Sequence, residues 1–150
     1  SVLEVGSGVG RFTVPLAERA WEVLAIDFNE KMLGRCREST RKYQHVTYLQ
    51  GDISDSPAID KRYDLVFAVT VLGHVTEPER YMAAVANMKN SGNSVFICEH
   101  IGNDAPLSPL TVLRSRETYE ACFAPLELVA AKEHFFINDR YNFMLYKQKS

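Results

Sequence analysis

Short apolar runs alternate with amphipathic segments of helix length along the first hundred residues. The runs that we expect to form strands are Ser1–Val5, Trp21–Ile26, Val46–Leu49, Tyr63–Val71 and Ser94–Cys98. The fourth run contains Leu-Val-Phe-Ala-Val without a polar interruption, which is typical of a central strand covered on both faces. The alternation predicts repeated βα units and a mostly parallel sheet in a single α/β domain.

Three helices are expected between these strands, at Arg11–Arg19, Asn29–Lys42 and Glu77–Met88. Asn29 and Thr76 are the expected N-caps, because their side chains accept hydrogen bonds from the first-turn N–H groups. Proline has no backbone N–H, so Pro15 and Pro78 must lie near the first turns of their helices.

The pattern changes after residue 100. Gly102–Pro109 is rich in turn-forming residues and predicts a loop, and Ser115–Phe123 predicts a short helix. Two β-rich runs follow, at Leu126–Phe136 and Tyr141–Tyr146. Their connection is too short for a crossover helix, so we expect them to pair antiparallel.

The composition is that of an ordinary globular domain, with 46% apolar and 24% charged residues and no apolar run long enough to cross a bilayer. A net charge of -2 supplies no general attraction to nucleic acid or to an anionic membrane. We therefore expect neither nucleic acid nor a membrane among its partners.

The cysteines at positions 36, 98 and 122 are far apart and have neither zinc-ligand spacing nor a disulfide framework. We expect reduced thiols, which favour a cytoplasmic setting, and no metal site. The chain begins inside an apolar run without a preceding signal peptide. We interpret residues 1–150 as one domain excised from a longer, multidomain chain.

The most informative motif is the glycine-rich stretch Glu4-Val5-Gly6-Ser7-Gly8-Val9-Gly10, between the first strand and the first helix. Glycines let backbone N–H groups approach a ligand closely, and the following helix N-terminus favours negative charge. Asp27 ends the second strand, where its carboxylate can accept hydrogen bonds from a ribose diol. Such bonds contribute roughly 1.5–3 kcal/mol each. Together these features predict an adenosine-containing cofactor.

The spacing of the glycines distinguishes between cofactors. The dinucleotide fingerprint that starts at Gly6 and Gly8 requires a small residue at position 11, where this chain has Arg11. Its third glycine, Gly10, comes one position early. Glu4 also suits a ligand that carries an ammonium and a sulfonium. A nicotinamide-dependent oxidoreductase therefore stays only as an alternative.

These motifs, with Gly51-Asp52 and Tyr63-Asp64-Leu-Val-Phe, resemble in order the motifs of class I S-adenosylmethionine-dependent methyltransferases. The resemblance covers nearly the whole chain. It implies a three-layer Rossmann-like α/β fold with strand order 3-2-1-4-5-7-6 and an antiparallel strand 7. It also implies S-adenosyl-L-methionine as cofactor, and that helices which usually precede the first strand are missing from this chain.

The resemblance assigns the first part of a cofactor site. The glycine loop, with Glu4, Ser7 and its glycines, packs against the methionine and ribose moieties. Asp27 holds the ribose hydroxyls, and Phe28 packs on the adenine. Core packing is an equally good interpretation of Phe28 from the sequence alone.

A second part of the cofactor site follows the third and fourth strands. Asp52 matches the residue that contacts the adenine amino group, although a turn-forming role competes with this interpretation. Ile53 lies beside the ring. Thr70, at the end of the fourth strand, corresponds to backbone near the methionine moiety, and Met32 is also expected in the site.

Methyl transfer is an in-line displacement, for which an enzyme supplies proximity, alignment and sometimes a base. The candidates follow the fourth and fifth strands, where open α/β sheets bind ligands. His74 lies in Val71-Leu72-Gly73-His74-Val75, which resembles the Leu-x-His-Val segment of many small-molecule and some protein N-terminus methyltransferases. It either relays a proton or holds the loop. Glu99 and His100 are the other two catalytic candidates.

The motif Asn-Pro-Pro followed by an aromatic residue, which marks methylation of nucleic-acid and glutamine amino groups, is absent, because the fourth strand ends in Ala68-Val69-Thr70-Val71. We therefore expect methyl transfer to an O or N atom of a small molecule, with a protein or peptide amine as second choice. A further alternative is a cofactor-binding scaffold domain without activity, within a larger polypeptide.

Overall fold

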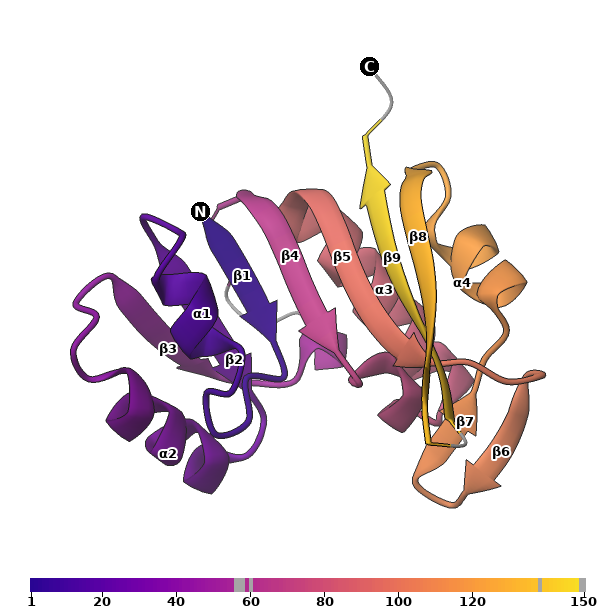
Figure 1. Cartoon of the computed structure of the whole chain (residues 1–150), viewed down its shortest axis with the longest axis horizontal. Helices are drawn as coiled ribbons and strands as arrows, with labels where there is room; N and C mark the ends of the chain where they lie inside the picture. The colour runs from indigo at the N-terminus through magenta and orange to yellow at the C-terminus, as the bar shows by residue number, and fades with distance from the viewer. Residues whose placement is uncertain (56–58, 60, 138, 149–150) are drawn as a thin grey trace.

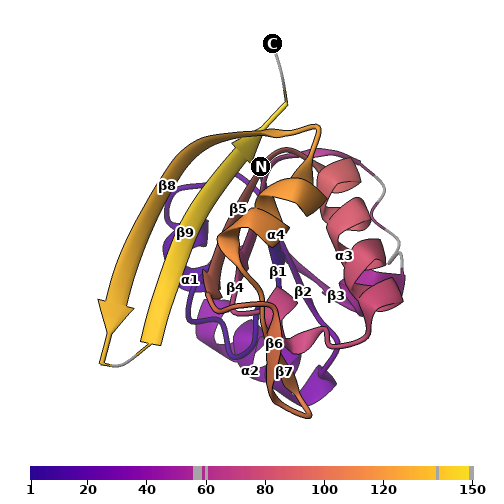
Figure 2. The same ribbon diagram turned by 90° about the vertical axis from the view of Figure 1, so that its right-hand side faces the viewer.

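The computed structural model describes residues 1–55, 59, 61–137 and 139–148. Across these residues the chain forms a seven-stranded sheet with helices on both faces and a separate two-stranded sheet (Figures 1 and 2). The strands of the large sheet are β1 (Val2–Val5), β2 (Val23–Asp27), β3 (Val46–Gln50), β4 (Tyr63–Val69), β5 (Gly92–His100), β8 (Glu127–Phe136) and β9 (Asp139–Lys147). The α/β class is confirmed.

The sheet has the order β3-β2-β1-β4-β5-β9-β8. Because β6 and β7 form the separate sheet, β8 and β9 are the sixth and seventh strands of the large one, and the predicted order 3-2-1-4-5-7-6 is confirmed. β1 to β5 run parallel, β9 runs antiparallel to β5, and β8 pairs antiparallel with β9. All four residues of β1 are buried. This burial is expected of a central parallel strand that has helices on both faces.

The helices are α1 (Thr13–Ala17), α2 (Glu30–Thr40), α3 (Pro78–Ser91) and α4 (Arg116–Phe123), with single 3-10 turns at η1 (Ile53–Asp55) and η2 (Leu72–His74). The two views place α1 and α2 on one side of the sheet, beside β1 to β3 (Figures 1 and 2). α3 and α4 lie on the opposite side, α3 behind β5 and α4 beside β8 (Figure 1). None of the described helices is long and apolar enough to cross a membrane.

Capping and proline positions explain where the helices begin. Asn29 caps α2 as predicted, because its Oδ1 accepts from the backbone N–H of Lys31 and Met32 at 3.1 and 3.3 Å. α1 is shorter than predicted, since a start at Arg11 would place Pro15 beyond the first turn. Thr76 was wrongly predicted to cap α3.

The N-cap of α3 is Glu77, one residue later than expected. Pro78 occupies the first helical position, where its fixed φ suits the helix and its missing N–H is not needed. Ser115 precedes α4, and its hydroxyl accepts from the Thr118 N–H at 3.1 Å, so the predicted short helix is confirmed to within one residue.

A hairpin of β6 (Ala105–Ser108) and β7 (Thr111–Leu113) replaces part of the loop that we expected at Gly102–Pro109. Pro106 and Pro109 obscured these strands, because proline cannot donate to a ladder and normally argues against a strand. The hairpin lies at the carboxyl ends of the parallel strands (Figures 1 and 2). It therefore borders the edge where a ligand site is expected.

The main core lies between the sheet and the α3–α4 side. Its largest fully buried side chains include Tyr119, Phe123 and Tyr146, and the rings of the last two are stacked with centroids 4.7 Å apart. A smaller cluster with Ala17 and Val23 lies on the α1 side. Packing on both faces fixes the strands, so the turns at their carboxyl ends start from rigid positions.

The α2 cap provides a test of the local structure. Asn29→Ala removes both side-chain hydrogen bonds to the first turn and should lower the free energy of unfolding by about 1 kcal/mol. Asn29→Asp retains the acceptor and should behave nearly as the parent in urea denaturation. Equal losses in the two variants would contradict a capping role.

Candidate cofactor and acceptor site

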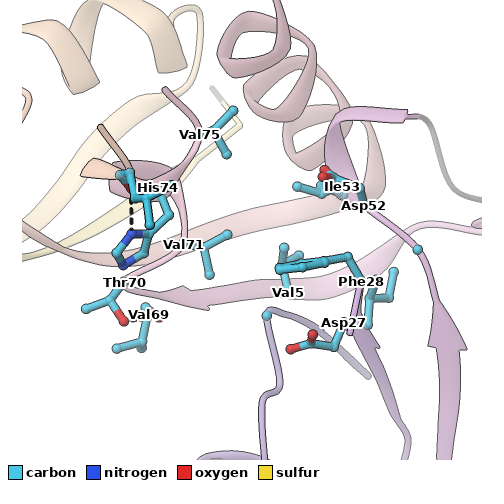
Figure 3. A pocket seen from close by; sticks show the side chains of 14 residues that line it. Val5, Asp27, Phe28, Asp52, Ile53, Val69, Thr70, Val71, His74 and Val75 are labelled. Carbon is cyan, nitrogen blue, oxygen red and sulfur yellow. Dashed lines mark hydrogen bonds between the residues drawn. The ribbon is translucent and has the colours of Figure 1, made fainter. Parts of the chain in front are cut away.

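A cavity of about 550 Å³ opens at the carboxyl ends of β1, β2 and β4 (Figure 3). Its lining residues are Val5, Gly6, Ile26, Asp27, Phe28, Gly51, Asp52, Ile53, Val69, Thr70, Val71, His74, Val75 and Leu110. The volume is within the usual range for a small-molecule or cofactor site. Most lining side chains are aliphatic or aromatic, and the polar groups stand at the two ends.

The glycine loop forms one wall, and its conformation requires glycine. Gly6, Gly8 and Gly10 have φ values of +72°, +54° and +90°, which L side chains rarely adopt. A Cβ on Gly6 would lie 2.6 Å from Cγ2 of Val71. The missing side chain therefore lets the loop after β1 approach the turn after β4.

Asp27 holds the neighbouring turns while facing the cavity. Its Oδ2 accepts from the Gly8 N–H at 2.8 Å, and its Oδ1 accepts from the Asn29 N–H at 2.9 Å. A carboxylate accepts about four hydrogen bonds, so each oxygen keeps acceptor capacity. Asp27 is 8% exposed, and it is positioned to accept from a ribose diol while shaping the loop around it.

Asp52 is the second carboxylate that lines the cavity, at the same end as Asp27. Its Oδ1 accepts from the Ser54 N–H at 2.8 Å, and Arg80 donates to its Oδ2 at 2.9 Å. Burial alone raises the pKa of Asp52, but the hydrogen bonds from Ser54 and Arg80 and the Arg80 charge outweigh burial, so its pKa is below the usual value. Asp52 forms the turn, as the competing interpretation held, and also lines the cavity.

Sequence reasoning missed Arg80, which also donates to Asp55 Oδ1 at 2.8 Å. On α3 it looks like any solvated helix charge, and only the fold brings it to Asp52. Phe28 is 71% exposed, which excludes core packing, whereas Ile53 is buried. Both lie at the same end as the two carboxylates (Figure 3). Together they make an apolar slot with acidic edges, which fits an adenosine.

His74 stands at the other end of the cavity, near Thr70 and Val69 (Figure 3). Its Nδ1 lies 3.1 Å from the Leu110 carbonyl oxygen and 3.3 Å from Thr111 Oγ1, both in the β6–β7 hairpin. A carbonyl oxygen only accepts, so Nδ1 carries the hydrogen. In the neutral ring Nε2 therefore keeps its lone pair.

The other two catalytic candidates do not line the cavity. Glu99 is 1% exposed, and its oxygens accept from three backbone N–H groups of the turn after β4. The His100 ring stacks on Tyr141 at a centroid distance of 5.2 Å, with Nε2 3.5 Å from Asp139 Oδ1. Of the three candidates, the structure brings His74 alone to the described cavity.

Several residues predicted to bind the cofactor lie behind or beside the lining. Glu4 is buried beneath the glycine loop, where its Oε2 accepts from the Thr13 hydroxyl at 2.5 Å. Ser7 is buried in the loop, Gly8 and Gly10 shape it, and Met32 is on the exposed side of α2. Their assignment to the cofactor stays a prediction.

Burial raises the pKa of Glu4 to about 7, with the nearby charge of Asp27 acting in the same direction and the Thr13 hydrogen bond opposing it. In the part of the chain that the structure describes, no group of three or more His, Cys, Asp or Glu side chains is arranged to hold a metal ion. Two carboxylates, Asp27 and Asp52, beside the apolar slot fit an adenosyl cofactor.

This sheet, its glycine loop and the two carboxylates of the cavity fit the class of α/β domains that bind an adenosyl cofactor. The chain belongs to the methyltransferase domain family, because the family model of that description matches residues 3–97. S-adenosylmethionine is the methyl donor of this family. The predicted fold, enzyme class and cofactor are confirmed at the level of the family.

Two curated relatives are N-methyltransferases. Phosphatidylethanolamine N-methyltransferase of Cereibacter sphaeroides is 35% identical over 106 residues, which are 69% of this chain and 52% of that protein. Phosphoethanolamine N-methyltransferase of Triticum aestivum is 30% identical over 112 residues, which are 70% of this chain and 22% of that protein. The chain thus spans about half of one relative and about a fifth of the other.

A solved structure with the same fold is the N-methyltransferase NodS of Bradyrhizobium japonicum WM9 in complex with S-adenosyl-L-homocysteine. It superposes with a TM-score of 0.87, covering 99% of this chain and 78% of that one, at 19% identity. At this identity the likeness shows the fold.

Glu4 makes the stability of the domain depend on pH. Because its folded pKa is raised, the folded state binds the proton more tightly than the unfolded chain and loses that advantage as pH rises from 4.5 to about 7. Glu4→Gln does not ionise, so its free energy of unfolding relative to the parent should rise over this range, by roughly 3 kcal/mol at most. Urea denaturation at pH 5 and pH 8 measures the difference; a pH-independent gap would contradict the buried titration.

Proposed function

We propose that this domain transfers a methyl group from S-adenosylmethionine to a nitrogen of a small molecule. The observation that carries the proposal is the division of the cavity. Asp27 and Asp52 stand at one end, and His74 stands at the other beside the β6–β7 hairpin. One end suits the adenosine of the cofactor, which leaves the His74 end for the acceptor.

Bound S-adenosylmethionine supplies an electrophilic methyl group on a sulfonium. The acceptor nitrogen forms the new bond to carbon with its lone pair, while the carbon–sulfur bond breaks and its electrons stay on sulfur. A protonated amine has no lone pair, so one proton must leave before the attack. We assign this proton to Nε2 of His74, which lines the cavity and whose other ring nitrogen, Nδ1, contacts the Leu110 oxygen.

The two curated relatives support an amine as acceptor. Their names state phosphatidylethanolamine and phosphoethanolamine, which share a primary amine two carbons from a phosphate ester. We therefore infer an ethanolamine-type amine as the first acceptor to test. A small-molecule hydroxyl is the second choice, because the same imidazole would remove its proton.

Cofactor binding tests the adenosine end of the cavity. Asp27→Asn removes the negative charge and replaces one accepting oxygen by a donating NH2 group. The Kd for S-adenosylhomocysteine should therefore rise roughly 10- to 100-fold, the effect of one charge-assisted hydrogen bond. Glu30→Gln removes an equal charge from the exposed first turn of α2 and should leave the Kd unchanged. Calorimetry compares them; equal affinities in all three proteins would place the ribose elsewhere.

Two substitutions at His74 distinguish a role as catalytic base from a role in holding the β6–β7 hairpin. Asn places an N–H donor near the position of Nδ1 and so preserves the hydrogen bond to Leu110, whereas Ala preserves neither function. If His74 is the base, both variants should lose roughly 10²- to 10⁴-fold in kcat with the amine acceptor. Full activity of His74→Asn beside an inactive His74→Ala would show that the histidine only holds the hairpin.

The same assays test the scaffold alternative. An active domain should convert S-adenosylmethionine to S-adenosylhomocysteine in the presence of ethanolamine-type amines. Tight cofactor binding without turnover, across amines and hydroxyl compounds, would favour a binding domain within a larger polypeptide. Binding of NAD in place of S-adenosylhomocysteine would contradict the proposed function altogether.

A further inference from the structure

The turn between β4 and α3 is held on its N–H side by one buried carboxylate. Glu99 Oε1 accepts from the N–H groups of Val71 and Leu72 at 2.9 and 2.8 Å, and its Oε2 accepts from the N–H of Gly73 at 3.1 Å. Glu99 comes from the end of β5, the neighbouring strand. Three successive peptide groups are therefore fixed to a single side chain.

The carbonyl side of the same turn is held by a buried guanidinium. Arg114 Nη1 donates to the Leu72 oxygen and Nη2 to the Val75 oxygen, both at 2.7 Å. The guanidinium carbon lies 3.7 Å from the centroid of the Tyr81 ring, so a cation–π contact covers its face. Arg114 follows β7, so it links this turn to the β6–β7 hairpin.

The two charges complement each other through the backbone between them. The peptide group between Leu72 and Gly73 contacts both: its carbonyl oxygen accepts from Arg114, and its N–H, that of Gly73, donates to Glu99. Both charges thus polarise the same peptide group, in surroundings of low dielectric constant. Burial raises the pKa of Glu99 above its usual value, and the hydrogen bonds from the three backbone N–H groups oppose this shift. Three donors that converge on its two oxygens fit a carboxylate.

This turn carries groups that face both ends of the cavity. Val71 lies against Gly6 of the glycine loop, and His74 contacts Leu110 and Thr111 of the hairpin. Thr70 has a φ of +53°, a conformation that a non-glycine residue keeps when its surroundings impose it. The position of His74 is therefore set by the bonds that hold the turn.

We propose that Glu99 and Arg114 act as a clamp that positions His74 and the β6–β7 hairpin against the acceptor. They are positioning residues, because the turn takes up their polar atoms and Glu99 lies outside the described cavity lining. The proposal rests on the proposed function for its kinetic consequence. Its structural part, the hold on residues 71–75, is independent of activity.

Glu99→Gln is the sharpest variant, since it has the same shape but turns one oxygen into a donor. The amide cannot accept from all three N–H groups, so at least one of them must lose its partner. Hydrogen exchange of residues 71–73 should accelerate roughly 10- to 100-fold, while that of β1 and β2 stays unchanged. Glu120→Gln, on the exposed face of α4, is the matched control and should exchange as the parent.

Arg114→Lys tests the other half, because a single ammonium replaces the two-pronged contact with Leu72 and Val75. Arg116→Lys, two residues away in an exposed pair with Glu120, is its control. Both clamp variants should shift the NMR signals of the His74 ring and lower kcat about tenfold or more. The Kd for S-adenosylhomocysteine should change by less than about threefold, since Asp27 and Asp52, at the adenosine end of the cavity, lie in other turns.

The outcomes are distinguishable. Fast exchange confined to residues 71–75 with a shifted His74 ring would support the clamp, even if the parent protein shows no turnover and the proposed function fails. Unchanged exchange with a lost kcat would make Glu99 a catalytic residue and overturn the proposal. Fast exchange throughout the sheet, with a lowered Tm, would mean that Glu99 and Arg114 only stabilise the fold as a whole, and would also overturn the proposed clamp.

Discussion

The carboxylate of Asp27 organises the adenosine end of this domain. β1 and β2 are neighbours in parallel register, so the glycine loop and the start of α2 leave the sheet side by side. Asp27 stands between them and accepts one backbone N–H from each. The loop conformations of positive φ are held by the same group that faces the cavity. Loop shape and ligand contact are therefore not separable at this position.

Much of the fold follows from local rules that act on the sequence. Continuous apolar runs predicted the central parallel strands, and the short connection after Phe136 predicted the antiparallel pair. Asn29 predicted the start of α2, because an N-cap side chain bonds backbone N–H groups within three residues of it. The glycine loop and Asp27 were predictable for the same reason, since their spacing relative to strand ends fixes where they lie.

The rest depends on contacts between segments far apart in the chain. Nothing near Glu99 indicates that its carboxylate reaches the turn after β4, and its position at a strand end made it look catalytic. Arg80 and Arg114 likewise resemble surface charges until the fold brings Asp52 and Leu72 to them. The β6–β7 hairpin was not predicted, because prolines in this segment normally argue against a strand. Charged side chains whose partners lie far away in the sequence are thus the hardest part of the site to predict from sequence.

The separate β6–β7 hairpin has a consequence for how such domains diversify. It pairs with no strand of the large sheet in the described chain, yet it supplies Leu110 to the cavity and a partner to His74. The hairpin meets the rest of the fold at a few points, such as the contact of the Leu110 oxygen with His74 Nδ1 and the bonds of Arg114, which follows β7, to Leu72 and Val75. A wall attached in this way can change length and side chains without disturbing strand register or core packing. Substitutions in the hairpin would reshape the His74 end of the cavity and leave the end with Asp27 and Asp52 as it is.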